Sequence, residues 1–334
     1  MKTRTLRSAL AAALVFSASA ASAAELKLAD FQPPSHFVVE QVYKPMDEAI
    51  KAGTNGDVSV TVFMGGELGP GPKEQYNRAV DGVTDIAFGL PGYTASNFPK
   101  TLLTELPGVI DAETGTAKVQ ANSDMLAKEY RRVALLALWN NAPNLLFTAE
   151  KPIRSLEDLK GLKIRTYNAQ GAEVLKAAGA SPIQLSWADV IPALSNGTIT
   201  GVLTSDEGGV NSKFWELGCK YFNSIGFAMG INAVAMNLDV YNDLPVEMKI
   251  ALRVAADRAE QAAWQRARSR VSANKDTLKS VGAEYVEDVP ASVIDHIKVA
   301  AAPLKKAWIK NMGADEAAKI MAEFDAFMKA NYGG

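Results

Sequence analysis

Four side chains of complementary chemistry follow one another in the middle of the chain: Arg165, Asn168, Trp187 and Thr204. Arginine presents a planar fork that can pair with a carboxylate through two hydrogen bonds, and it stays charged at every relevant pH. The amide and the hydroxyl can bond to further polar atoms, and the indole offers a broad apolar face. Together these residue types could hold a small organic anion. Most arginines, however, are simply solvated, so the prediction depends on the elements that bring the four together.

Residues 155–204 alternate between helical and strand patterns, with strand candidates at 162–166, 183–185 and 199–204. Polar capping residues precede the intervening helices and glycines follow them. This alternation is typical of a parallel α/β sheet with right-handed crossovers. In such sheets ligands bind beyond the carboxyl ends of the strands, close to helix N-termini. We therefore expect the four residues to meet at that edge.

The first part of the chain repeats the same alternation, with strand candidates at 25–29, 58–63 and 84–88. Two similar halves predict two α/β domains, and a long helix from Pro245 to Leu278 has the length to lie along both. Sustained apolar heptads are missing from that helix, which argues against a coiled coil. The predicted domains are 24–142 plus 230–270 and 143–229 plus 271–334.

The first residues have the three-part layout of a secretory signal peptide. A basic stretch at 2–7 precedes an apolar run at 9–16 and small residues at 21–23. The run is too short for a membrane helix, which needs about 20 residues. An alanine-rich tail is the other interpretation. We predict a signal peptide at 1–23, cleaved after Ala23, and therefore an exported protein.

Composition excludes several classes of function. Lys and Arg number 35 against 37 Asp and Glu, so the chain lacks the basic surplus that nucleic-acid binding favours. Cys219 is the sole cysteine, which rules out an intrachain disulfide. The sequence has two histidines and no metal-ligand motif. We therefore expect no metal, no cofactor and no nucleic-acid partner.

Two motifs invite other interpretations. The glycine-rich loop at 64–73 is not a phosphate-binding loop, because Pro72 precedes Lys73 and Glu74 follows where Ser or Thr is required. It is either a binding-cleft loop or a plain turn. The adjacent Asp206 and Glu207 could form the catalytic pair of an exported hydrolase. No histidine, G-x-S-x-G or S-x-x-K accompanies them, so a solvated loop with capping carboxylates is the preferred interpretation.

Several motifs occur in a family-specific order: L-K-G-L-K-I-R, an asparagine three residues after the arginine, G-A-S-P, and an aromatic residue that opens a helix. G-G-E-L-G, S-K-F-W-E at 212–216 and D-L-P before the long helix extend the pattern. The combination resembles the solute-binding proteins of tripartite ATP-independent periplasmic (TRAP) transporters, DctP-like family. The resemblance implies a periplasmic-binding-protein-like fold of two α/β domains that close on a hinge. It also implies a periplasmic, non-enzymatic protein that delivers an organic acid to integral membrane subunits. We expect a monomer.

The resemblance assigns roles to individual residues. It implies that Arg165 binds the ligand carboxylate, that Asn168 is the family's asparagine, and that Trp187 replaces its usual phenylalanine. Thr204 stands where relatives have a ligand-binding asparagine. The cleft-loop interpretation adds Glu67 and Glu74. The neighbouring polar and aromatic positions complete the predicted ligand contacts: Tyr93, Trp139 and Ser205.

Two departures from the family bear on the ligand. Many relatives have a second arginine on the strand after the tryptophan loop, and an ungapped alignment puts Leu145 there. The charge that relatives have near 200–205 is also missing. We therefore predict a monocarboxylate with an apolar or aromatic body. The alternatives are a C4-dicarboxylate or another organic acid, and a sensory protein that docks on a receptor.

Overall fold

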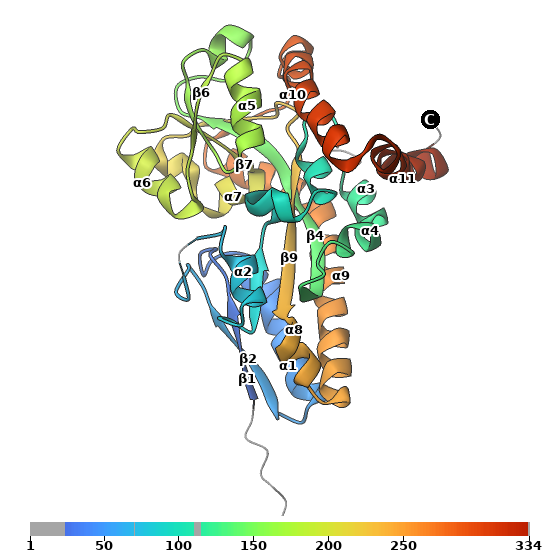
Figure 1. The fold of residues 1–334 in the computed structure, drawn as a ribbon. Coiled ribbons are helices and arrows are strands. Elements are labelled where there is room, and N and C mark those ends of the chain that lie inside the picture. Colours follow the sequence, from blue (N-terminus) through green and yellow to red (C-terminus); the bar gives the residue numbers. More distant parts are fainter. Residues whose placement is uncertain (1–23, 70, 110–114, 333–334) are drawn as a thin grey trace, which may run out of the picture.

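The computed structural model describes residues 24–69, 71–109 and 115–332. The predicted signal peptide lies outside these residues. Figure 1 shows an upper and a lower lobe joined by two strands that pass between them, β4 (Val133–Thr148) and β9 (Met229–Asn237). Hydrogen bonds connect the strands in the order β2-β1-β3-β9-β4-β7-β5-β6. The fold is the α/β architecture predicted from the sequence.

The lower lobe, which we call the first domain, contains the predicted parallel strands. These are β1 (Ala24–Ala29), β2 (Val58–Phe63) and β3 (Ile86–Gly89). β1 pairs in parallel with both β2 and β3, and β3 continues antiparallel to β9. The alternation of apolar residues along β2 places Val58 and Val60 in the core.

The upper lobe, the second domain, contains β5 (Lys163–Thr166), β6 (Ser181–Gln184) and β7 (Gly201–Ser205). β5 pairs in parallel with β6 and with β7, as the strand–helix alternation predicts. β8 (Tyr221–Asn223) pairs with β4, and β10 (Glu284–Val286) pairs with β8. Arg165 therefore lies on the strand between the other two parallel strands.

One strand was not predicted in its full length. Residues 139–144 (W-N-N-A-P-N) have a polar composition that on its own predicts a loop, but β4 runs through them without interruption. Its first part pairs with β9 and its second part with β7. Register shifts occur at Leu135/Ala137 and Asn140/Pro143, and the second admits a proline into a buried strand. The ladder partners are distant in sequence, so local composition could not reveal them.

The helices cover both faces of the sheet (Figure 1). The main ones are α1 (Lys44–Gly53, after a π-helical turn at Val39–Tyr43), α2 (Gln75–Val80), α3 (Gly115–Ala121), α4 (Ser123–Ala127), α5 (Ala169–Ala177), α6 (Val190–Ser195), α7 (Asp206–Asn211), α8 (Leu238–Asp243), α9 (Val246–Ser280), α10 (Ala291–Met312) and α11 (Ala314–Tyr332). Short 3-10 turns occur at Pro91–Asn97, Thr101–Glu105, Leu156–Leu159, Trp187–Asp189 and Phe214–Leu217. The predicted long helix is thus α9, whereas the predicted loop around Asp206 is the helix α7.

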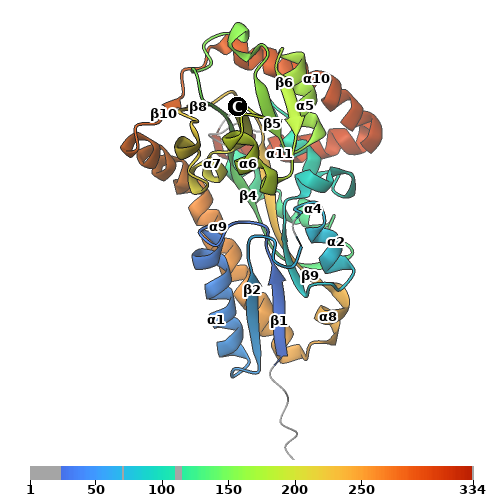
Figure 2. The same cartoon turned by 90° about the vertical axis from the view of Figure 1, so that its left-hand side faces the viewer.

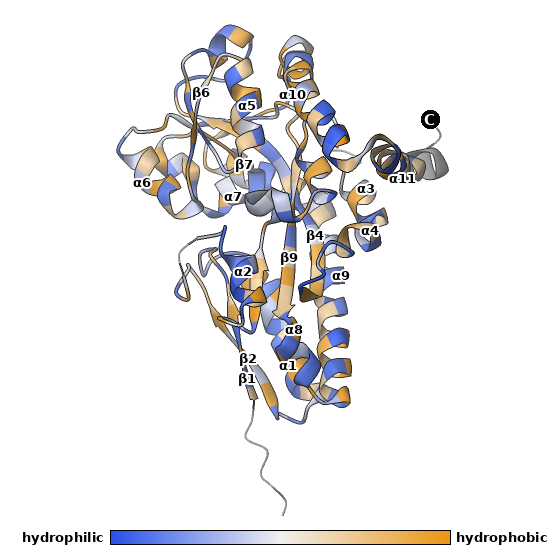
Figure 3. Ribbon diagram, in the orientation of Figure 1, coloured by the Kyte–Doolittle hydropathy of each residue, from blue (hydrophilic) through white to orange (hydrophobic). Residues whose placement is uncertain are grey.

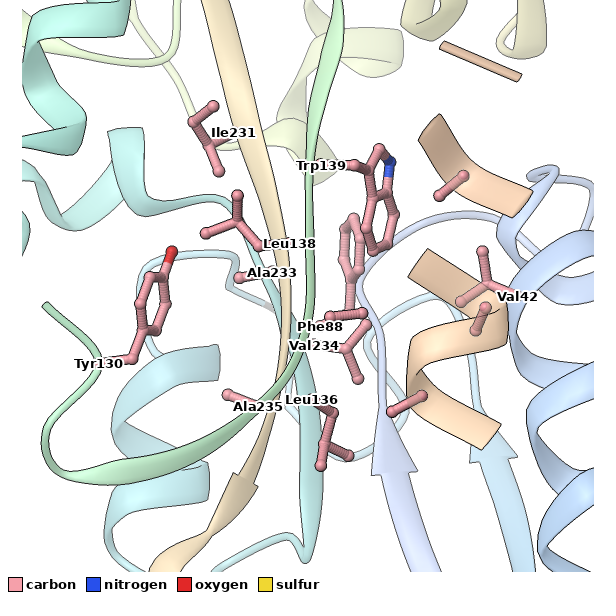
Figure 4. Packing of buried hydrophobic residues seen from close by; sticks show 14 of the residues in the cluster. Val42, Phe88, Tyr130, Leu136, Leu138, Trp139, Ile231, Ala233, Val234 and Ala235 are labelled. Atoms are coloured by element: carbon pink, nitrogen blue, oxygen red, sulfur yellow. The ribbon is translucent and has the colours of Figure 1, made fainter. Parts of the chain in front are cut away.

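The apolar core of the first domain lies between the sheet and two helices, α1 and α9. The two helices run side by side in Figure 2. α9 contributes mainly alanines to this core, together with Trp264. Small side chains let the helix approach β4 closely, and Figure 4 shows the large residues of the strands opposite. Figure 3 shows that hydrophilic and hydrophobic residues are interspersed along α9.

The second domain has its own apolar clusters, built from β5, β7, α5 and α10. The C-terminal end divides differently from the sequence-based boundary at 271–334. Trp308 of α10 and three residues of α11, Ala317, Ile320 and Phe324, are buried in the cluster of the first domain. The periodicity of a terminal helix shows which face is apolar, but not which domain covers it. Among the helices of the described residues, none combines the length and apolar character that a bilayer span requires.

Candidate functional site

Arg165 is fully buried beside the first domain. Its Nε donates to the backbone carbonyl of Leu185 at 3.1 Å, and its Nη2 donates to the hydroxyl of Tyr93 at 2.9 Å. The guanidinium carbon lies 5.5 Å from the ring centroid of Trp187 and 5.9 Å from that of Tyr167. Nη1 is buried and has no hydrogen-bond partner within the described residues. The guanidinium is therefore fixed in place with one nitrogen available to an anion.

The three aromatic residues around Arg165 line a cavity between the two domains. In this structure its volume is about 30 Å³, so the two domains are closely packed around it. The first domain and the inter-lobe strands contribute Phe31, Gln32, His36, Leu90, Tyr93, Asn141, Asn144 and Gly230, and the second domain contributes Tyr167, Trp187, Thr204, Ser205 and Gly208. Aromatic faces alternate with amides and hydroxyls, and this described lining contains no Lys, Arg, Asp or Glu.

His36 is the titratable imidazole of this lining. Burial, together with the nearby charges of Arg266 and Arg270, lowers the pKa of His36 to about 3. The imidazole is therefore neutral at physiological pH and adds no positive charge to the cavity. The described lining itself contains no Lys or Arg, and the guanidinium of Arg165 lies directly behind the lining residues Tyr167 and Trp187.

Two hydrogen bonds join the domains next to the cavity. One is the bond from Arg165 to Tyr93. In the other, the hydroxyl of Tyr167 donates to Oε2 of Glu105, which belongs to the first domain. The rings of Tyr93 and Tyr167 lie 5.4 Å apart, so the two bonds are neighbours. Burial raises the pKa of Glu105 to about 7, although the bond from Tyr167 opposes the shift.

The structure brings several of the predicted site residues together. Tyr93, Trp187, Thr204 and Ser205 all line the cavity. Ser205 also caps α7, because its Oγ accepts from the backbone N–H of Gly208 at 3.1 Å. The four residues come from a loop of the first domain, a helical turn and the end of β7. Of the residues expected at the sheet edge, Trp187 and Thr204 line the cavity, and Arg165 lies behind Trp187.

Asn168 has a different position. It is the N-cap of α5, where its Oδ1 accepts from the backbone N–H of Gly171 at 2.9 Å. The residue is 6% exposed and does not line the cavity. The sequence pattern that identified it is equally the pattern of a helix start.

The remaining predicted contacts lie elsewhere. Glu67 and Glu74 are exposed, and Glu74 borders a separate cavity of about 450 Å³ that shares Tyr93 and Tyr167 with the central one. Trp139 is fully buried in the core of the first domain, where its ring lies 6.0 Å from that of Phe88 (Figure 4).

Leu145 does not occupy a ligand-facing position. It is fully buried in an apolar cluster of the second domain. Its neighbour Asn144 lines the cavity instead and is paired in register with Ser205 on β7. Successive side chains of a strand point to opposite faces, so an alignment error of one residue assigns the wrong face.

The acidic pair is not on a solvated loop. Asp206 and Glu207 are both buried at the start of α7. Glu207 accepts from Arg266 at 2.8 Å and lies 3.7 Å from Nε of Arg270, while Asn274 donates to Asp206 at 3.1 Å. These partners all belong to α9. The carboxylates therefore attach the second domain to the long helix, a role that sequence spacing could not show.

Sequence reasoning missed Tyr167, Asn144 and Glu105. Tyr167 was recognisable, because it follows Arg165 by two residues and so leaves the strand on the same side. Glu105 had no local signal, since its partner Tyr167 is 62 residues away. Among the described residues, no group of three or more His, Cys, Asp or Glu is placed to hold a metal ion.

Comparison with known proteins identifies the class. The model of the family described as bacterial extracellular solute-binding protein, family 7, matches residues 28–311, and the chain belongs to this family. Its members are the solute-binding proteins of TRAP transporters, which bind small molecules and deliver them to the transporter's membrane subunits.

Individual relatives are distant. The ectoine-binding periplasmic protein TeaA of Halomonas elongata is 27% identical over 293 residues, which cover 83% of this chain and 82% of TeaA. A marine metagenome TRAP solute-binding protein specific for aromatic acids, crystallised with 3-hydroxybenzoate, is 26% identical with a TM-score of 0.79, covering 92% of this chain and 98% of that one. The pyroglutamate-binding DctP7 of Bordetella pertussis has the same fold, with a TM-score of 0.82 at 24% identity over 90% of this chain and 99% of that one.

Proposed function

We propose that this protein captures a monocarboxylate with an apolar or aromatic body and delivers it to a TRAP transporter. We place it in the periplasm, with the signal peptide removed near Ala23. The observation that carries the proposal is the buried Nη1 of Arg165, which lacks a hydrogen-bond partner in the described part of the chain. A buried arginine is costly unless an anion pairs with it, and a carboxylate matches its fork.

The cavity lining supports a ligand with a single carboxylate. A second carboxylate would enter a space whose described lining has no Lys or Arg of its own, and burying it unpaired would cost several kcal/mol. Trp187 and Tyr167 provide flat apolar faces for a ring or a branched chain. The aromatic-acid-specific relative, which holds 3-hydroxybenzoate, is a precedent for such a body. The C4-dicarboxylates are the alternative ligand class.

We further propose that binding is accompanied by closure of two domains, 24–142 plus 230–270 and 143–229 plus most of 271–334, on a hinge. Ligand contacts would come from Arg165, Tyr93, Trp187, Thr204 and Ser205. Ser205 and His36 both line the cavity, but Ser205 Oγ accepts from the backbone N–H of Gly208 and His36 Nδ1 accepts from the backbone N–H of Val38. Neither contact is that of a nucleophile with its base, so we propose binding without turnover.

A thermal-shift screen over matched acids tests the proposal. Phenylacetate and benzoate represent the monocarboxylates, succinate and fumarate the dicarboxylates, and neutral sugars and amines the controls. A ligand at 100 times its dissociation constant should stabilise the fold by about 2.7 kcal/mol. Stabilisation by sugars or amines alone would refute carboxylate binding. Stronger stabilisation by the dicarboxylates would refute the single-carboxylate proposal and leave the transport class intact.

A further inference from the structure

Glu105 is a buried carboxyl group with an unused oxygen. The side chain is 4% exposed, and its Oε2 accepts from Tyr167. Oε1 is buried without a hydrogen-bond partner in the part of the chain that the structure describes. Within the described ranges no cation pairs with Glu105, and Tyr167 is the titratable group that faces it. A buried polar atom without a partner is costly, so this arrangement needs an explanation.

Two glycines border the unused oxygen. A Cβ atom at Gly92 would lie 2.5 Å from Oε1, and one at Gly230 would lie 3.5 Å from it. Gly230 also lines the central cavity. The same Cβ position at Gly230 is 4.0 Å from the hydroxyl of Tyr167, which lines the cavity too. The missing side chain at Gly230 thus leaves the carboxyl within reach of the cavity.

We propose that Glu105 is a specificity-determining residue that accepts a hydrogen bond from an N–H or O–H group of the ligand. The preferred ligand is then an organic acid with a donor group, such as a hydroxy acid or a lactam acid. This inference rests on the proposed function, because it assumes that Arg165 holds the carboxylate of the same molecule.

The cavity offers a hydrogen-bond donor and a hydrogen-bond acceptor to the same ligand. Arg165 offers an unpartnered donor and Glu105 an unpartnered acceptor, and the two groups are connected through the neighbouring rings of Tyr93 and Tyr167. A site built to bond a ligand hydroxyl or N–H rejects the analogue that lacks it, since the buried group is then left unpaired. An oxo group cannot donate, so it would not satisfy an ionised Glu105.

The test is a calorimetric titration with matched acids at pH 8, 3-hydroxybenzoate against benzoate and mandelate against phenylacetate. In the wild-type protein the hydroxy member of at least one pair should bind about tenfold to a hundredfold more tightly, because a hydrogen bond to a charged group contributes that much. Equal affinities within both pairs would overturn the inference while the proposed function stands. Absence of binding by all four acids would overturn both.

Two variants locate the effect. Gly230→Ala adds a methyl group at ordinary van der Waals distance from its neighbours, so the fold should persist while the path to Oε1 closes. Glu105→Leu removes the acceptor. Each should bring the ratio of the two affinities close to one, chiefly by weakening the hydroxy acid. Glu129→Gln is the control, because Glu129 is a half-buried carboxyl in the first domain that bonds to Lys100 and Thr101 instead. A ratio that survives in Gly230→Ala and Glu105→Leu, or that collapses equally in Glu129→Gln, refutes the assignment.

Discussion

Replacement of Arg165 by methionine should separate ligand binding from folding. In the free protein, the substitution removes the bonds to Leu185 and Tyr93, which costs about 1–3 kcal/mol for each group left unpaired. It also removes a buried guanidinium whose Nη1 has no described partner, and this relieves several kcal/mol of desolvation. The two effects oppose each other, so we expect a small change in the free energy of unfolding.

Ligand affinity should respond very differently to the same substitution. Truncation of one partner of a buried charge pair costs roughly 2–5 kcal/mol, which corresponds to a loss of affinity from about 30-fold to several thousand-fold. Arg165→Lys should recover only part of this loss, because an ammonium lacks the planar fork. The measurement is titration calorimetry with the tightest acid found in the screen, beside a chemical unfolding curve for each variant.

The matched control for Arg165 is Arg154→Lys. Arg154 is 42% exposed and pairs with Glu284 and Asp288 on the surface, so its substitution should leave affinity within twofold of wild type. An Arg165→Met variant that is folded and binds the acid within threefold of wild type would refute the role of Arg165. A variant that does not fold would instead show that our balance of the two stability effects is wrong.

Three further outcomes follow from the structure. Trp187→Ala should weaken aryl acids about tenfold and small aliphatic acids much less, because the indole is the flat face of the cavity; calorimetry with both kinds of acid checks this. Glu207→Gln should destabilise the fold by about 3–5 kcal/mol, since Arg270 is fully buried beside it, and a melting temperature equal to wild type would contradict this. Burial raises the pKa of Glu105 from 4.5 to about 7. The stability that the protonated carboxyl contributes is therefore complete below pH 4.5 and is lost as the pH rises to 7. The loss in the free energy of unfolding is up to about 3 kcal/mol. Unfolding curves of wild type and Glu105→Gln should therefore diverge between pH 4.5 and 7, and parallel curves would contradict the raised pKa.

The sequence predicted the elements well wherever the signal was local. Strand–helix alternation, helix caps and glycine stops gave the parallel strands of both domains and the long helix α9 (Val246–Ser280). Arg165 was found because a motif and a strand end coincide there. Trp187 and Thr204 were expected at one edge of the sheet because consecutive parallel strands end there. Both line the cavity, and their contact with a ligand stays a prediction.

What the sequence could not give depends on contacts between distant residues. The polar stretch at 139–144 becomes part of a strand because β7 and β9 supply its ladder partners. Asp206 and Glu207 are buried because α9 brings arginines to them from about 60 residues further along the chain. Trp139 packs in the core of the first domain and Leu145 in an apolar cluster of the second domain. The face of β4 on which each side chain lies depends on the register shift at Asn140/Pro143.

In the mechanism that we propose, ligand recognition and domain closure use the same residues. Arg165 and Tyr167 are two positions apart in the second domain, and each bonds to the first domain, through Tyr93 and Glu105 respectively. Opening the domains would break both bonds and expose the guanidinium and the carboxyl to water, which solvates them. Closing without a ligand buries Arg165 Nη1 and Glu105 Oε1, neither of which has a partner among the residues that the structure describes, and each unpaired group costs free energy. An acid with a donor group would satisfy both atoms at once, so we infer that such a ligand favours the closed form more than a plain acid does.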